Sequence, residues 1–240
     1  MKKTNNLIGS IIIWKTKTKY VLRSLIFLIK NLGDFKYFFR WIKSFRNNHN
    51  ALDDELPWLT YDAVKWLENF LSDDKYVFEY GSGGSTLFLA KRANKVVSVE
   101  HDKQWYKLVE RKLAEKNLEN VEYILQVPRV IGPKENTKED CFPSTEPKYK
   151  GMCFEKYVKS IDRYPDKYFD LVVVDGRSRR ACIKRSVKKV KPGGYLMLDN
   201  SERKLYEPLF EELKDFRRTD FFGLGNYNLY PWQTTLWEIK

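Results

Sequence analysis

Cysteine is scarce in this sequence. Its 240 residues include three cysteines, Cys141, Cys153 and Cys182, and no two of them have C-x-x-C spacing. This pattern excludes a disulfide-stapled scaffold and a thiolate zinc knuckle. Sparse, unpaired cysteines suit a reducing compartment, so a cytoplasmic location is expected. Twelve glycines and nine prolines without a period also exclude collagen-like and low-complexity chains.

A long hydrophobic run is also missing from the beginning of the chain. The longest uncharged stretch there runs from Thr4 to Trp14, which is eleven residues. A membrane-spanning helix needs about 20 largely apolar residues. No small-residue cleavage site follows this stretch, so neither a span nor a secretory signal is expected.

Acidic residues are almost absent from residues 1–50. This segment holds eleven Lys or Arg and one acid, Asp34, whereas residues 51–240 hold 33 bases and 31 acids. The formal net charge of +12 therefore belongs mainly to the first 50 residues. A nucleic-acid enzyme would be expected to carry its cations on the catalytic body, so nucleic acid is not an expected partner.

Residues 1–50 are predicted to form a basic amphipathic helical arm. Apolar residues from Val21 to Leu32 recur at three- and four-residue steps, which is the helical period. Two interpretations remain open. The arm could lie on an anionic membrane surface and make the protein a peripheral membrane protein. Alternatively, it packs on the body and leaves its Lys and Arg side chains in water.

Residues 51–240 alternate between strand and helix patterns. Helices are expected to begin at the N-caps Thr60 and Asp102. Strands are predicted over 75–80, 95–100, 121–127, 169–175, 195–198, 218–222 and 233–238, and helices over 60–71, 85–93, 102–116, 152–163, 179–190 and 202–216. The last two strands are expected to be antiparallel. The predicted fold is α/β: one doubly wound, mostly parallel seven-stranded sheet preceded by the helical arm.

Residues 128–150 interrupt this alternation. Four of the nine prolines lie in this segment, amid charged residues and few aliphatic ones. A loop of this length inside a compact domain is usually functional. We therefore expect it to lie near the mouth of a substrate site.

A glycine turn follows the first predicted strand. Residues 77–85 read VFEYGSGGS, and Glu100 ends the next strand twenty-one residues after Glu79. Glycines let a backbone approach a ligand closely, and an acid at the end of the second strand can accept both ribose hydroxyls. This pattern fits an adenosyl cofactor or a nicotinamide dinucleotide. The dinucleotide motif wants a third glycine where Thr86 stands, which disfavours a dehydrogenase.

Two further motifs complete an ordered set. The fourth strand reads DLVVVDG over 170–176, and KPGGYLMLD follows over 191–199. Together with E-x-G-x-G and the acid that closes the second strand, these motifs resemble the class I S-adenosylmethionine-dependent methyltransferases. The resemblance covers roughly residues 75–239.

The resemblance implies roles for individual residues. Gly81, Ser82 and Gly83 would line the methionine part of S-adenosylmethionine, and Glu79 would orient it through its ammonium or a water. Glu100 would hold the ribose, and Asp175 would face the methyl-donor end. Ser85 replaces the third glycine of the usual loop and would also contact the cofactor. No adenine-contacting residue can be assigned, because residues 126–128 lack the acid usually found there.

The resemblance implies a methyltransferase, and we interpret it as an O-methyltransferase acting on a hydroxyl of a small molecule, a glycan or a lipid-linked sugar. Asp175 or Asp199 would be the base. Asp175, Asp199 and Asn200 also look like the metal-ligand trio of magnesium-dependent catechol and caffeoyl-coenzyme A methyltransferases, so Mg²⁺ is a candidate cofactor. The lysine that follows the first of these acids in those enzymes is missing, since residues 176–180 read GRSRR. We interpret His101 as structural.

Arg177, Arg179 and Arg180 cluster at the predicted mouth. Guanidinium groups recognise carboxylate or phosphate, which suggests an anionic acceptor such as a uronic acid or a lipid-linked sugar phosphate. The alternative is a solvated helix start.

The D/N-P-P-Y type of motif found in many amino-methylating nucleic-acid enzymes is absent. Other possible functions are an NAD-dependent dehydrogenase, an aminopropyl transferase, or a non-catalytic binding protein that retains the fold.

Overall fold

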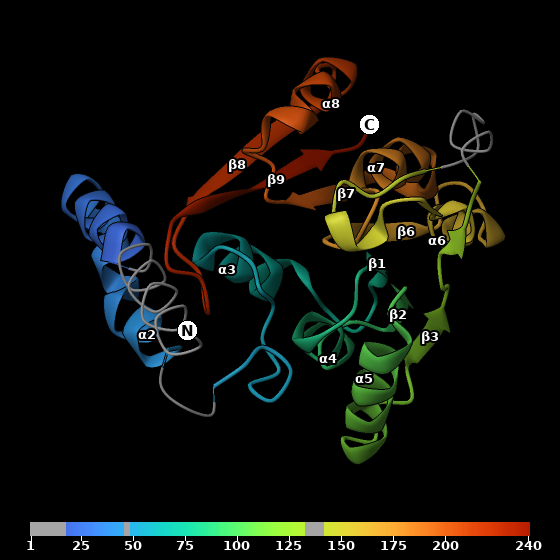
Figure 1. The fold of residues 1–240 in the computed structure, drawn as a ribbon, viewed down its shortest axis with the longest axis horizontal. Coiled ribbons are helices and arrows are strands. Elements are labelled where there is room, and N and C mark those ends of the chain that lie inside the picture. The colour runs from blue at the N-terminus through green and yellow to red at the C-terminus, as the bar shows by residue number, and fades with distance from the viewer. Residues whose placement is uncertain (1–17, 46–48, 133–141) are drawn as a thin grey trace, which may run out of the picture.

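A computed structural model describes residues 18–45, 49–132 and 142–240. Its main feature is a seven-stranded sheet with the order β3-β2-β1-β6-β7-β9-β8 (Figure 1). The strands are β1 (Tyr76–Tyr80), β2 (Lys95–Glu100), β3 (Val121–Leu125), β6 (Phe169–Val174), β7 (Val190–Asp199), β8 (Arg217–Gly223) and β9 (Trp232–Glu238). The first five of these are mutually parallel, and β9 runs antiparallel to both β7 and β8. The predicted doubly wound, mostly parallel sheet is confirmed.

Helices cover both faces of the sheet because its central strands are apolar on both sides. On β6, Leu171 and Val173 face one hydrophobic cluster, and Val172 and Val174 face another. One face is covered by α3 (Tyr61–Phe70) and α4 (Gly84–Ala90), with α5 (Lys103–Glu115) packed beside α4. The other is covered by α6 (Glu155–Val158), the 3₁₀ helix η3 (Lys159–Arg163), α7 (Arg179–Ser186), the 3₁₀ helix η4 (Val187–Lys189) and α8 (Glu207–Glu212).

The structure corrects several predicted boundaries. Met152–Cys153 is a short strand, β5, paired with β4 (Arg129–Val130), so the helix expected over 152–163 begins only at Glu155. The helix expected over 202–216 is reduced to the 3₁₀ helix η5 (Lys204–Tyr206) and α8. Pro208 lies in the first turn of α8, where its missing N–H costs no hydrogen bond, so it does not interrupt the helix.

The two predicted helix caps behave differently. The Asp102 side chain accepts hydrogen bonds from the backbone N–H groups of Gln104 and Trp105, as expected of an N-cap. Thr60 precedes α3, but its hydroxyl donates to the carbonyl oxygen of Phe221 at 3.2 Å and does not cap the helix. Its side chain therefore ties α3 to β8.

The described part of the N-terminal arm packs against the body. It is helical over 18–30 and continues through η1 (Leu32–Tyr37, 3₁₀) and α2 (Phe38–Lys43), which lie beside the β8–β9 hairpin in Figure 1. Leu28 and Trp41 are each 1% exposed and contact Leu224 in one hydrophobic cluster. The Trp41 indole also donates to the carbonyl oxygen of Asn228 at 2.8 Å. Residues 1–17 and 46–48 of the predicted arm lie outside the described residues.

The outer side of the arm is apolar as well. Ile29, Leu32 and Phe39 are 71%, 76% and 78% exposed. None of the helices in the described ranges has the length and hydropathy needed to cross a membrane. The arm therefore combines a buried contact to the body with an exposed apolar face.

Trp41→Ala should destabilise the protein by about 3–5 kcal/mol, because it removes a fully buried indole and leaves a cavity. Chemical denaturation monitored by circular dichroism measures this. Phe39→Ala, two residues away on the opposite, exposed side of α2, is the matched control and should change the free energy of unfolding by less than about 0.5 kcal/mol. Equal effects of the two substitutions would contradict the packing described here.

Candidate active site

A cavity of about 420 Å³ opens at the carboxyl ends of β1, β2 and β6. The chain winds in opposite directions from β1 and β6, and ligands of open α/β sheets bind at such a point. Three segments form most of the wall: the glycine turn 81–85, the end of β2 at 100–102, and residues 175–179 after β6. Six of the predicted site residues line this cavity: Gly81, Ser82, Gly83, Ser85, Glu100 and Asp175.

The turn after β1 requires glycine at Gly81. This residue has a φ of +94°, and a Cβ atom there would lie 2.7 Å from the backbone of Gly176. The loops after β1 and β6 therefore meet without a side chain between them. This contact fixes the distance between two walls of the cavity.

Glu100 holds the glycine turn against the end of β2. It is 2% exposed, and its carboxylate accepts hydrogen bonds from the Ser82 N–H (3.2 Å), the Ser82 hydroxyl (2.8 Å), the His101 N–H (2.7 Å) and the Asp102 N–H (2.8 Å). Burial tends to raise the pKa of Glu100, but hydrogen bonds and the neighbouring His101 outweigh burial and lower it. The carboxyl is therefore ionised at neutral pH and can accept the hydroxyls of a ribose.

Glu79 lies behind the turn and does not line the cavity. It is fully buried, and it accepts hydrogen bonds from the hydroxyls of Thr86 (2.6 Å) and Ser98 (2.5 Å). Its Oε1 has no hydrogen-bond partner among the residues that the structure describes. Burial raises the pKa of Glu79 to about 7. Its contact with a cofactor stays a prediction, and the structure shows that it braces the first turn of α4.

Arg179 joins the ends of β6 and β7. Its guanidinium donates to the Asp175 carboxylate (2.7 Å), to the Asp175 carbonyl (2.6 Å) and to the Asp199 carbonyl (2.5 Å). The Asp199 carboxylate is nearly inaccessible and accepts hydrogen bonds from Trp232 Nε1 and Thr234 Oγ1, both at 2.8 Å. Burial, followed by the proximity of Asp175, raises the pKa of Asp199 to about 7, and burial also raises the pKa of Asp175. The structure thus brings the two predicted acids together but opens only Asp175 to the cavity.

The residues considered for Mg²⁺ do not fit a metal ion. Arg179 is paired with Asp175, and the Asn200 side-chain oxygen accepts a hydrogen bond from Arg203 at 2.8 Å. In the described ranges, no three His, Cys, Asp or Glu side chains are grouped so as to hold a metal. The guanidinium groups of Arg179 and Arg203 thus already contact the oxygen atoms that would have to bind Mg²⁺. A metal ion beside them would be repelled by their positive charge.

The cavity wall also holds three aromatic residues to which no sequence motif pointed, Trp58, Trp105 and Tyr149. The Trp105 indole donates to the Ser82 carbonyl at 2.8 Å, and Tyr149 OH lies 2.9 Å from His101 Nε2. Trp105 was detectable, because the Asp102 cap places it in the first turn of α5, beside the end of β2. Tyr149 had no such signal, since it belongs to the segment 128–150, where no periodicity indicates its direction.

Glu79→Gln should stabilise the protein at neutral pH but not in acid. Burial raises the pKa of Glu79 to about 7 in the folded chain, whereas the ordinary pKa of a glutamate exposed to water, as in the unfolded chain, is 4.5. Between these values the unfolded chain releases a proton that the folded chain keeps, so stability falls as pH rises through this window. The advantage of Gln should grow by up to about 3 kcal/mol from pH 4.5 to pH 7.5. Urea denaturation at both pH values measures it, and a constant difference would contradict the assignment.

Comparisons with known proteins identify the fold. No protein-family model matches the chain, and no curated protein matches it. Among solved structures, the O-methyltransferase TomG of Streptomyces achromogenes, solved with S-adenosylmethionine, is 15% identical, with 82% of this chain and 92% of that chain covered and a TM-score of 0.52. A protein assigned as an O-methyltransferase from Klebsiella pneumoniae is 14% identical, with 83% and 94% covered and a TM-score of 0.55.

An enzyme named for the methylation of RNA has a similar architecture. An rRNA methylase from Streptococcus thermophilus is 17% identical, with 73% of this chain and 93% of that chain covered and a TM-score of 0.50. The similar structures thus include enzymes with different acceptors, and identities this low establish architecture only. The chain has the fold of the class I S-adenosylmethionine-dependent methyltransferases.

Proposed function

We propose that this protein is an S-adenosylmethionine-dependent methyltransferase that methylates a hydroxyl of a small molecule, a glycan or a lipid-linked sugar. The observation that carries the proposal is the cavity between the glycine turn, Glu100 and Asp175. It lies where this fold binds its ligands, and two of its walls carry carboxylates. Bound S-adenosylmethionine would supply a methyl group on a positively charged sulfur.

The cavity wall offers a partner for each part of such a cofactor. Residues 81–83 present backbone without large side chains to the methionine portion, and Glu100 is an ionised acceptor for the ribose hydroxyls. Trp105 and Tyr149 provide flat aromatic surface for a purine. Asp175 lies at the opposite wall, where it would face the methyl donor. Holding donor and acceptor in line supplies much of the acceleration of a displacement reaction.

Asp175 is the proposed base for the acceptor hydroxyl. Its side chain is 30% exposed and lines the cavity, and its raised pKa brings it closer to the range in which a general base works at neutral pH. Asp199 is enclosed by Trp232 and Thr234. Its proposed role is to keep Arg179 and Asp175 in position and not to contact the acceptor.

The rival functions have weaker support. The position of the third glycine of a dinucleotide site is occupied by Thr86, whose hydroxyl is committed to Glu79. Proteins named for rRNA methylation are among the similar structures, but residues 51–240 are nearly neutral and lack the basic excess of a nucleic-acid surface. An aminopropyl transferase or a non-catalytic binding protein would also use this cavity. Only an assay of methyl transfer distinguishes these functions from a methyltransferase.

Tritium transfer from methyl-labelled S-adenosylmethionine into a fractionated cell lysate tests the reaction. The parent should label a small-molecule, glycan or lipid fraction, and Asp175→Asn should lower the rate about 100-fold or more because the base is lost. Asp166→Asn, at an exposed acid that pairs with Lys189, is the matched control and should keep the parental rate. Absence of label from every fraction, or label only in RNA, would refute the proposal. A parental rate for Asp175→Asn would refute the role of Asp175.

We also propose that the arm holds the protein on the cytoplasmic surface of an anionic membrane. The exposed apolar residues Ile29 and Phe39 lie on a segment that also carries Lys19, Arg23 and Lys30. Apolar insertion combined with attraction to anionic lipid is the usual basis of interfacial binding by such helices. The packing of Trp41 on the body leaves this outer face available.

Vesicle sedimentation of the full chain tests the membrane contact. The parent should sediment with vesicles that contain phosphatidylserine and much less with neutral vesicles. Ile29→Ser combined with Phe39→Ser should lower the bound fraction at least fivefold, because both insert in the proposed arrangement. Leu108→Ser, at a 46% exposed position on α5, is the control and should leave binding unchanged. Equal sedimentation of the parent and the double variant would contradict the proposal.

A further inference from the structure

A second cavity adjoins the candidate active site on the side of α7. Its volume is about 690 Å³, and it shares Glu146, Gly176, Arg177 and Arg179 with the first cavity. Volumes of this size are typical of small-molecule sites. A ligand in the second cavity would therefore lie next to the wall that carries Asp175.

The second cavity is strongly cationic. Of its 17 lining residues within the described ranges, seven are Lys or Arg and one, Glu146, is acidic. Four of these cations have carboxylate partners: Arg177 with Glu146, Arg179 with Asp175, Lys184 with Glu212, and Arg185 with Asp162. The other three, Arg180, Lys188 and Arg203, make no ion pair among the residues described.

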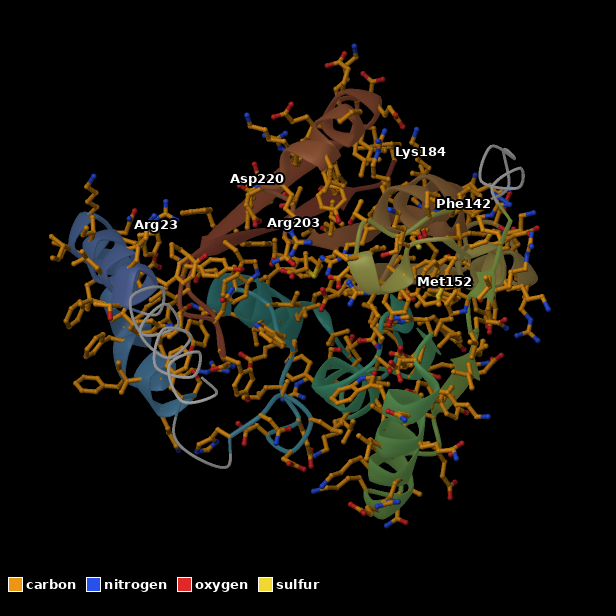
Figure 2. All side chains as sticks on the ribbon, in the orientation of Figure 1. Arg23, Phe142, Met152, Lys184, Arg203 and Asp220 are labelled. Carbon is orange, nitrogen blue, oxygen red and sulfur yellow. The ribbon has the colours of Figure 1, made fainter. Side chains whose placement is uncertain are left out.

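The three unpaired cations lie on α7 (Arg180), on η4 (Lys188) and in the loop after β7 (Arg203), and the paired Lys184 lies between the first two. Arg180, Lys184 and Lys188 are spaced four residues apart along α7 and η4, so they share one face, where like charges repel each other. Arg180 stands at the beginning of α7, where a cation also opposes the helix dipole. Arg203 reaches the cavity from the loop after β7. Figure 2 labels Lys184 and Arg203, together with Phe142 of the same wall.

The accumulated charge has a direct physical consequence. A cavity lined by charges of one sign focuses the field and attracts the opposite charge. A phosphate or pyrophosphate group brings two or three negative charges, whereas a carboxylate brings one and would compensate the cations of this cavity less fully. Guanidinium forks are also suited to phosphate oxygens. Phe142, Leu205 and Tyr206 supply apolar wall for the rest of a ligand.

We infer that the second cavity binds the phosphate group of a phosphorylated methyl acceptor, through Arg180, Lys188 and Arg203. The inference rests on the proposed function and adds the chemical class of the acceptor to it. With its phosphate in this cavity, the acceptor would extend past Gly176 and Arg177 toward Asp175. The earlier hypothesis based on Arg177, Arg179 and Arg180 is thereby revised, because Arg177 and Arg179 are committed to carboxylates of the protein.

Calorimetric titration of the full chain with inorganic pyrophosphate tests the site. The parent should bind it, and Arg180→Gln combined with Lys188→Gln should weaken binding at least tenfold. Arg203→Gln alone should weaken it as well, which covers the case in which the double variant folds poorly. Arg111→Gln, at an exposed arginine on α5, is the charge-matched control and should bind like the parent. Lack of binding by the parent, or parental affinity in both variants, would overturn the inference.

Two further probes identify the source of the phosphate. Glucose 1-phosphate should displace pyrophosphate if free sugar phosphates are the acceptors, and monomeric dihexanoyl phosphatidic acid should displace it if the phosphate belongs to a lipid. Displacement by neither would overturn the inference, because it would leave pyrophosphate as a ligand without an acceptor. S-adenosylhomocysteine is titrated separately. Loss of that binding with pyrophosphate binding intact would refute the methyltransferase and not the phosphate site.

Discussion

Four acidic residues lie at the carboxyl edge of the sheet. The structure of the site depends on how the negative charge of each carboxylate is neutralised or stabilised. A buried carboxylate without partners is too costly to keep ionised. Glu79 meets this constraint by a raised pKa, and Glu100 meets it by accepting hydrogen bonds from the glycine turn and from the end of its own strand. Asp175 and Asp199 meet it through Arg179, which joins the ends of β6 and β7. The same contacts that stabilise these charges define the walls of the candidate active site.

Arg179 lies in the wall of two cavities that differ in the charge of their lining. On one side lies a cavity with Glu100 and Asp175 in its wall, which suits a cationic sulfur nucleoside. On the other lies a cavity in which Arg180, Lys188 and Arg203 make no ion pair with the described residues. A cationic donor and an anionic acceptor would thus be drawn to adjoining cavities. This charge separation connects the proposed reaction with the proposed acceptor class, although neither cavity requires the other in order to bind its ligand.

The architecture and the first cavity were largely predictable from sequence. Short apolar segments that alternate with amphipathic ones dictate a doubly wound sheet, and a glycine turn after a strand can form only a few structures. The second cavity was not predictable, because its cations come from α7, from η4 and from the loop after β7, and only the folded chain places them in the wall of one cavity. The direction in which the Arg179 side chain points could not be predicted from the sequence either. Nothing in residues 176–180 indicates that Arg179 turns back onto Asp175, where a metal ion had been considered.

The central claim is that the crevice beside the glycine turn holds a sulfur nucleoside, and calorimetry with S-adenosylhomocysteine and, separately, with NAD tests it most directly. We expect S-adenosylhomocysteine to bind the parent with a submillimolar dissociation constant and NAD to give no heat. Gly83→Arg, which places a long side chain in the cavity, should abolish binding, whereas Gly33→Arg, at a glycine with no atom within 4 Å of an added Cβ, should not. Binding of NAD in place of S-adenosylhomocysteine, or unchanged binding by Gly83→Arg, would contradict the account.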